Sequence, residues 1–383
     1  MIADSSIKTN MPSGLYIHVP FCEVKCRYCN FYVVPGQHYQ TGRMIAALER
    51  QINDLDCQIP VTTVYIGGGS PSYLPQNDLS RLLSAAIARF DAIEEVTVEI
   101  NPDQADVDLL DCLKSHGVNR LSIGAQSFHN DELKFLSRTY RAERIYQVVT
   151  DARAAGFENI SLDLIFAIPG STIVSWAHSL REAMGLGVEH ISAYSLTVER
   201  GTQLFKEIRE NTVKPTSESL DCDQFKLAIE LLEAGGLVQY EISNFSKPGF
   251  ECKHNDLVWS GRPYVGIGPS AGGYFDGKRT TNLAGIRPYI EAVENDLSVV
   301  RESYCPQGEE RACETAVLML RRSRGIHLKD FQNLTGFNVD DLFLETIADH
   351  VKRGNLDKSG EHISLTQQAR LIADSILCDF SSV

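Results

Sequence analysis

Residues 15–29 read LYIHVPFCEVKCRYC, a short apolar run followed closely by three cysteines. The run from 15 to 19 is typical of a buried β-strand. Cys22, Cys26 and Cys29 follow it with the spacing C-x3-C-x2-C. Three thiolates in one tight loop are soft ligands, which select zinc, copper(I) or an iron–sulfur cluster. The stretch therefore predicts a metal-binding loop at the end of a strand.

Apolar runs of the same kind recur through the first two-thirds of the chain and alternate with stretches typical of helices. The predicted strands are residues 15–19, 63–66, 96–100, 120–123, 160–166 and 191–196. The predicted helices between them are residues 39–55, 78–90, 105–116, 142–155 and 171–186. Strict alternation predicts a parallel sheet, and nearly apolar strands are expected when both faces of that sheet are covered. Since the glycines at 67–69 are not a dinucleotide-binding fingerprint, we predict an α/β fold with a partial (β/α)6 TIM-like barrel.

The chain is longer than one ordinary core usually supports, so we expect a large domain and a smaller one. After the last predicted strand a Gly-rich stretch appears, and from about Ser303 helix formers dominate. The expected segments are a flexible N-terminus 1–13, the barrel 14–245, a Gly-rich appendage 246–302 that closes the barrel, and a mainly helical, winged-helix-like domain 303–383.

Composition limits the classes of function. With 43% hydrophobic residues and no run of roughly 20 apolar residues, the chain is expected to be cytoplasmic, with no membrane span and no visible signal peptide. A formal charge of −14 argues against nucleic acid as a partner. The strongest candidate for a local basic binding site is a group of arginines, which we interpret as a solvated helix face instead. It consists of Arg311, Arg321, Arg322 and Arg324.

The number of cysteines in the loop discriminates between metals. A structural zinc site usually has four protein ligands, which His18 or His38 could complete here. A cubane cluster held by three cysteines instead leaves one iron free to bind another molecule. Spacing alone favours the cluster over zinc, with a disulfide as a more distant alternative.

In a barrel of this kind the chemistry gathers at the carboxyl ends of the strands. Gly68 and Gly69 follow the second predicted strand and permit close approach of a ligand to the backbone. Glu99 ends the third strand, Gln126 follows the fourth, and Asp163 lies within the fifth. We therefore expect these polar groups to surround a ligand near the cysteines, although each alone is more simply structural.

The loop and its surroundings resemble the radical S-adenosylmethionine (SAM) superfamily, in which such a loop follows the first barrel strand and carries an aromatic residue, here Tyr28, before the last cysteine. A closer resemblance, over nearly the whole chain, is to the HemN/HemW branch of oxygen-independent coproporphyrinogen oxidases and haem chaperones. The segments that carry it are residues 16–22, 67–72, 99–102, 124–128, 163–165 and 169–170.

The resemblance implies a 4Fe-4S cluster on Cys22, Cys26 and Cys29, with SAM bound at the open iron and cleaved by one electron to an adenosyl radical. It also implies an electron donor such as a flavodoxin or a ferredoxin. The SAM contacts that it implies are Tyr16, Tyr28, Gly68, Gly69, Ser70, Glu99, Gln126, Arg138 and Asp163.

Within that branch, one position of the loop favours the chaperones. The oxidases carry a further cysteine two residues after the last cluster ligand, where this chain has Phe31. The segments 240–245, 252–255 and 266–271 also look like the chaperone version, although Val258 stands where a tyrosine is usual. The resemblance therefore implies haem as a bound cargo that is passed to an acceptor protein.

Two alternatives and one further residue stay open. The first alternative is oxidative decarboxylation of coproporphyrinogen III, and the second is a zinc-stabilised binding module without redox chemistry. His254 is a candidate haem ligand because imidazole is a common axial ligand. A hydrogen bond to neighbouring backbone is the simpler interpretation of this histidine.

Overall fold

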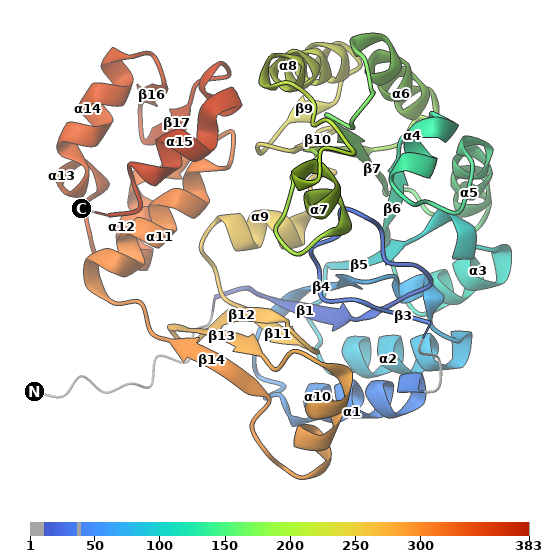
Figure 1. Cartoon of the computed structure of the whole chain (residues 1–383). Coiled ribbons are helices and arrows are strands. Elements are labelled where there is room, and N and C mark those ends of the chain that lie inside the picture. Colours follow the sequence, from blue (N-terminus) through green and yellow to red (C-terminus); the bar gives the residue numbers. More distant parts are fainter. Residues whose placement is uncertain (1–10, 37–39, 383) are drawn as a thin grey trace, which may run out of the picture.

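Six parallel strands form the wall of an open barrel with helices around its outside (Figure 1). The computed structural model describes residues 11–36 and 40–382. The barrel strands are β1 Ser13–Val19, β4 Val61–Gly68, β5 Glu95–Ile100, β6 Arg120–Gln126, β7 Ile160–Phe166 and β8 His190–Ser195. The connecting helices are α1 Thr41–Asp54, α2 Gln76–Ala88, α3 Val107–Ser115, α4 Asn130–Phe135, α5 Ala142–Ala154 and α6 Ile173–Gly185. The predicted partial (β/α)6 barrel is confirmed.

The start of β1 lies earlier than we predicted. Ser13, which we assigned to the N-terminal segment 1–13, is buried as the first residue of this strand. Its N–H donates to the Pro60 carbonyl at 3.0 Å. Residues 1–10 lie outside the described part of the chain.

The outer helices cover the barrel with one apolar stripe each. In α1, Met44, Ile45, Leu48 and Ile52 are buried, a spacing that places them on one face of a helix. They pack in the large core formed between the sheet and its helices. Within residues 11–36 and 40–382, no helix has the length and apolar character needed to cross a membrane.

The inner face of the barrel is polar, which differs from the nearly apolar strands that we predicted. Leu15 and Ile17 of β1 face the helices and belong to the core. Tyr16, between them, is paired in register with Tyr65 of β4, and the two rings lie 6.2 Å apart. Side chains alternate between the two faces of a strand, so hydroxyl and charged groups collect on the inside while the outside stays apolar.

The segment after the barrel extends the sheet at both of its edges. Next to β8 come β10 Asn244–Ser246 and β9 Val238–Gln239. Next to β1 come β11 Tyr264–Ile267, β12 Gly272–Phe275, β13 Lys278–Asn282 and β14 Val300–Tyr304. The helices of this part are α7 Gln203–Arg209, α8 Glu218–Ala234, α9 Lys253–Trp259 and α10 Ile286–Glu294. Residues 246–302, predicted to close the barrel, thus lengthen the sheet beyond β1.

The C-terminal part has a separate hydrophobic core and lies beside the barrel (Figure 1). Its helices are α11 Gly308–Leu320, α12 Leu328–Thr335, α13 Val339–Leu342, α14 Leu344–Lys352 and α15 Ala373–Cys378. A three-stranded antiparallel sheet accompanies them, made of β15 Ile326–His327, β17 His362–Leu365 and β16 Leu356–Ser359. Helices with a small sheet of this kind fit the predicted winged-helix-like shape.

The arginines that we interpreted as a solvated helix face hold the two parts together instead. The Arg311 guanidinium donates to the Gly261 carbonyl at 2.7 Å. Arg322 is buried and pairs with Asp256 at 2.8 Å, while Arg321 lies over the ring of Trp259. The interpretation was wrong because the partners come from the appendage, far away in the sequence.

Candidate functional site

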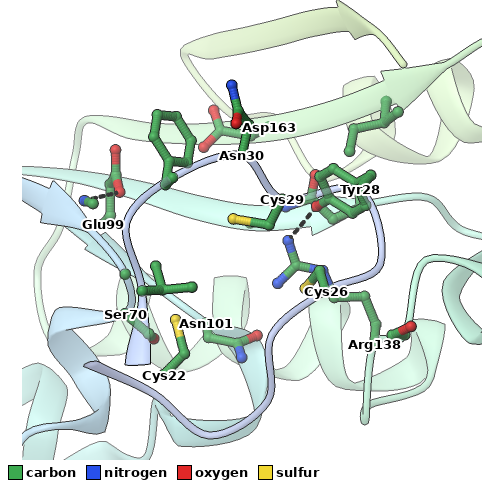
Figure 2. A pocket seen from close by; sticks show the side chains of 18 of the residues that line it. Cys22, Cys26, Tyr28, Cys29, Asn30, Ser70, Glu99, Asn101, Arg138 and Asp163 are labelled. Atoms are coloured by element: carbon green, nitrogen blue, oxygen red, sulfur yellow. Dashed lines mark hydrogen bonds between the residues drawn. The ribbon is translucent and has the colours of Figure 1, made fainter. Parts of the chain in front are cut away.

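A pocket of about 510 Å³ opens at the carboxyl ends of the barrel strands. Figure 2 shows that the cysteine loop forms one side of it and that the ends of the strands form the other. The predicted site residues that line it are Cys22, Cys26, Tyr28, Cys29, Gly68, Gly69, Ser70, Glu99, Gln126, Arg138 and Asp163. The structure therefore brings most of the predicted site together.

The cysteine loop is closed at its base by a short parallel pair of strands. These are β2 Phe21–Cys22 and β3 Val34–Pro35. The Cys29 N–H donates to the Cys26 carbonyl at 3.1 Å, which makes a tight turn between these two residues. All three cysteines are free and half-buried, and they line the same pocket.

This set of donors fits a cluster chemically. Burial raises the pKa of the Cys22 thiol to about 12 and raises the pKa of Cys29 as well. Both thiols are therefore protonated before a metal displaces the protons. In the described part of the chain, no three His, Cys, Asp or Glu side chains are already arranged to hold a metal ion. Binding thus requires the three sulfurs to converge.

His18 is not available as the fourth ligand of a zinc site at this loop. One ring nitrogen of His18 lies 3.0 Å from the Tyr16 hydroxyl, and the other lies 2.8 Å from the Tyr32 carbonyl. Both nitrogens are therefore engaged, and burial lowers the pKa of this imidazole. His38 lies outside the described residues.

The carboxylate of Glu99 is fixed on the opposite side of the pocket. Tyr65 donates its hydroxyl to Oε1 at 2.8 Å, and the Gly68 N–H donates to Oε2 at 3.0 Å. Burial, with a smaller contribution from nearby Asp163, raises the pKa of Glu99 to about 7. A Cβ at Gly67 would lie 2.6 Å from the carboxyl carbon, so a side chain here would displace the carboxylate.

Asp163 and Arg138 are two further charged residues that line the pocket. Ser122 donates its hydroxyl to Asp163, with the nearer oxygen at 3.0 Å. Burial raises the pKa of Asp163. The Arg138 guanidinium donates to the Tyr28 hydroxyl at 2.8 Å and lies between the cysteines (Figure 2). A cation there favours thiolates and any anionic group of a ligand.

Backbone conformation shapes another part of the wall. Gly68 has a φ of 102°, which is readily accessible only to glycine. A Cβ at Gly69 would lie 2.5 Å from the Phe21 carbonyl oxygen, so the two segments meet without room for a side chain. Gln126 has a φ of 63° and ends β6 at an irregular register, which turns this residue into the pocket.

Two predicted residues do not line the pocket. Tyr16 lies inside the barrel, where its ring contacts His18 and Tyr65. His254 is also buried, and its Nδ1 lies 2.9 Å from the Thr63 hydroxyl near the start of β4. Burial lowers the pKa of His254 to about 3. This neutral imidazole is held at the end of the barrel opposite the cysteine loop.

Sequence reasoning missed several polar residues of the pocket. They include Tyr65, Asn101, Ser122 and Tyr194. Tyr65 and Ser122 lie inside strands, where we read the whole run as apolar. The signal that could have found them is their position: alternate residues of a strand share a face, and a hydroxyl on that face points inward with Glu99 or Asp163.

Comparison with known proteins matches both parts of the chain. The family model of the radical SAM superfamily matches residues 16–183, and that of the HemN C-terminal domain matches residues 307–372. The heme chaperone HemW of Bacillus subtilis is 34% identical, over 95% of this chain and 98% of its own length. That of Synechocystis is 35% identical, over 82% and 79%.

A mitochondrial relative and a solved structure extend the comparison. Radical S-adenosyl methionine domain-containing protein 1 of Danio rerio is 34% identical, over 72% of this chain and 63% of its own length. The solved structure of coproporphyrinogen III oxidase (HemN) from Escherichia coli has a TM-score of 0.83 at 23% identity, and covers 97% of this chain and 90% of its own. At that identity the likeness shows the fold alone.

Proposed function

Because this chain belongs to the HemW family of radical SAM proteins, we propose that it binds haem and passes it to an acceptor protein, with a 4Fe-4S cluster and SAM in its barrel. The single observation that carries the cofactor part is that three free cysteines and a set of fixed polar groups line one pocket. The cargo part depends on the relatives, which are named heme chaperones.

Cys22, Cys26 and Cys29 would hold the cluster through their sulfurs. Such a cluster, when bound, supplies one electron for the reduction of SAM. The loop places the cysteines half-buried, which leaves one side open to an electron donor of the flavodoxin or ferredoxin kind. Arg138, held by Tyr28, stabilises the thiolates by its charge.

The strand ends would hold SAM. Glu99 has both oxygens fixed by protein donors and retains lone pairs that can accept hydrogen bonds from ribose hydroxyls. Gly68 and Gly69 bring backbone close to the pocket without side chains in the way. Asp163 and Arg138 offer opposite charges to a ligand that itself carries both signs.

Two residues, His254 and Phe31, bear on the predicted binding of haem. His254 is engaged with Thr63 inside the barrel. Coordination of haem by its imidazole would therefore require α9 to leave that position. Phe31 is exposed on the cysteine loop, where the oxidases of the branch carry a further cysteine. This residue is one reason why we propose a chaperone rather than an oxidase.

The test begins with anaerobic reconstitution of the full chain with iron and sulfide. We expect iron and acid-labile sulfide to be retained, and an electron paramagnetic resonance signal of the reduced cluster that changes when SAM is added. Cys26→Ala should lose that signal, whereas Cys57→Ala, which changes an exposed cysteine, should keep it. Zinc without sulfide would overturn the cluster and favour the zinc-stabilised module.

The cargo is tested separately. Haem titration of the reconstituted protein should give a saturable change in the absorbance spectrum, followed by transfer to an added apo-haemoprotein. Decarboxylated product from coproporphyrinogen III under reducing conditions would contradict the chaperone proposal and favour the oxidase.

A further inference from the structure

We propose that Tyr65 is a positioning residue that holds the Glu99 carboxylate ready for a pair of ribose hydroxyls, an inference that rests on the proposed binding of SAM. Tyr65 lies in the middle of β4, on the inner face of the barrel. Its side chain lines the same pocket as Glu99. The Tyr65 hydroxyl donates to Oε1 of Glu99. Among residues 11–36 and 40–382, it is the only side-chain group that donates to this carboxylate.

Two independent groups fix the two oxygens of Glu99. The Gly68 N–H reaches Oε2 at 3.0 Å, and the Tyr65 hydroxyl reaches Oε1 at 2.8 Å. Because the torsion of a terminal carboxylate is broad, one donor alone leaves the second oxygen free to rotate. With both donors present the plane of the carboxylate is set, and each oxygen keeps a lone pair that can accept a hydrogen bond from a further donor.

A carboxylate held in this way is complementary to two neighbouring hydroxyl groups. One hydroxyl can donate to each oxygen, which is the arrangement that a ribose with free 2′ and 3′ hydroxyls offers. The absence of a Cβ at Gly67 leaves the space that the carboxylate occupies. Positioning by a fixed neighbour typically decides whether such a contact forms with useful strength.

The ring of Tyr65 has a separate structural role, which allows the hydroxyl to be tested alone. The ring lies 5.3 Å from the ring of His254 and 6.2 Å from that of Tyr16. Phenylalanine keeps these contacts, so Tyr65→Phe removes one hydrogen bond and little packing. Tyr146→Phe is a matched control, since Tyr146 donates to the Glu182 carboxylate at 2.6 Å from helix α5, away from the pocket.

The experiment is calorimetric titration of the reconstituted, unreduced protein with SAM and with its 2′,3′-dideoxy analogue. We expect Tyr65→Phe to weaken SAM binding about tenfold and to weaken binding of the analogue less than about twofold, because the analogue lacks the groups that Glu99 would accept from. Tyr146→Phe should match wild type for both ligands.

Each other outcome has a distinct meaning. Unchanged SAM affinity in Tyr65→Phe would overturn the positioning role. An equal loss for SAM and for the analogue would also overturn it, because it would show a general defect of the pocket. If wild type binds neither ligand, the proposed function itself fails at SAM binding, and this inference fails with it.

Discussion

The guanidinium of Arg138 donates a hydrogen bond to the hydroxyl of Tyr28 at 2.8 Å. Tyr28 lies between the last two cysteines of the loop, and Arg138 follows the short helix α4, so this contact joins the loop to the segment between α4 and α5. The Nε of Arg138 is buried and has no hydrogen-bond partner within the described residues. The Tyr28 hydroxyl is therefore an important partner of a partly buried charge.

Tyr28→Phe should lower the free energy of unfolding of the protein without metal by about 1–3 kcal/mol, because a partly buried charged donor loses its acceptor. Urea denaturation followed by circular dichroism measures the change. Tyr304→Phe is the control, since the Tyr304 hydroxyl is also hydrogen-bonded to a charged side chain, as the donor to Glu314, but this tyrosine is half-exposed. That variant should change stability by less than about 1 kcal/mol. Equal losses in both would contradict the special role of the buried contact.

Gly67→Ala should displace the Glu99 carboxylate while leaving the barrel folded. The added Cβ would lie 2.6 Å from the carboxyl carbon, closer than nonbonded carbon atoms approach. We expect SAM affinity to fall at least about tenfold, measured by calorimetry on reconstituted protein. Gly42→Ala in helix α1 has nothing within 4 Å of the new Cβ and should bind normally. Normal binding by Gly67→Ala would show that Glu99 does not contact the ligand.

Titration of Glu99 should make the stability of the protein depend on pH. Because its folded pKa is raised to about 7, the folded state retains a proton that the unfolded state has lost above its own pKa of about 4.3. Stability from this group is therefore greatest at low pH and falls as the pH rises from about 4.3 to 7, by at most roughly 4 kcal/mol.

Urea unfolding of the protein without metal, measured from pH 5 to pH 8, tests this sign. In Glu99→Gln, the free energy of unfolding should fall less steeply with rising pH than in wild type. Asp163 contributes a decline of the same sign because its pKa is also raised. A wild-type slope identical to that of Glu99→Gln would mean that Glu99 titrates normally.

The barrel was predictable because its signals are local. Each strand and the helix that follows it are neighbours in sequence, so apolar runs and helical stripes such as Met44 to Ile52 mark them directly. The pairing of β11 with β1 was not predictable in the same way. It joins Tyr264 to Gly14, far apart in the chain, and depends on tertiary packing.

The site was found where polar residues stand at the ends of strands and missed where they stand within them. Glu99 and Gln126 interrupt or end apolar runs, and the C-x3-C-x2-C spacing identifies the cysteines as candidate ligands. Tyr65 lies among Val64 and Ile66, so its inward direction follows only from the alternation of the strand. Tyr16 was placed among the SAM contacts by resemblance, but its ring lies within the barrel rather than along the pocket wall.

His254 provides the last prediction, because its position suggests a structural role that can be separated from haem binding. Its Nδ1 contacts the Thr63 hydroxyl, and its backbone N–H donates to the buried carboxylate of Glu95 at 3.0 Å. Since the backbone contact survives substitution, His254→Ala loses the ring, its hydrogen bond and its packing on Tyr65. We expect the free energy of unfolding to fall by about 2–4 kcal/mol.

In the conformation described here, haem affinity should depend little on this side chain, because the imidazole is buried and already hydrogen-bonded. Haem titration of His254→Ala, and of Thr63→Val as a variant that removes only the hydrogen-bond partner, separates the two roles. If Thr63→Val binds haem normally while His254→Ala loses binding at a temperature where both are folded, then the imidazole is a haem ligand. Helix α9 must in that case move out of the barrel when haem binds.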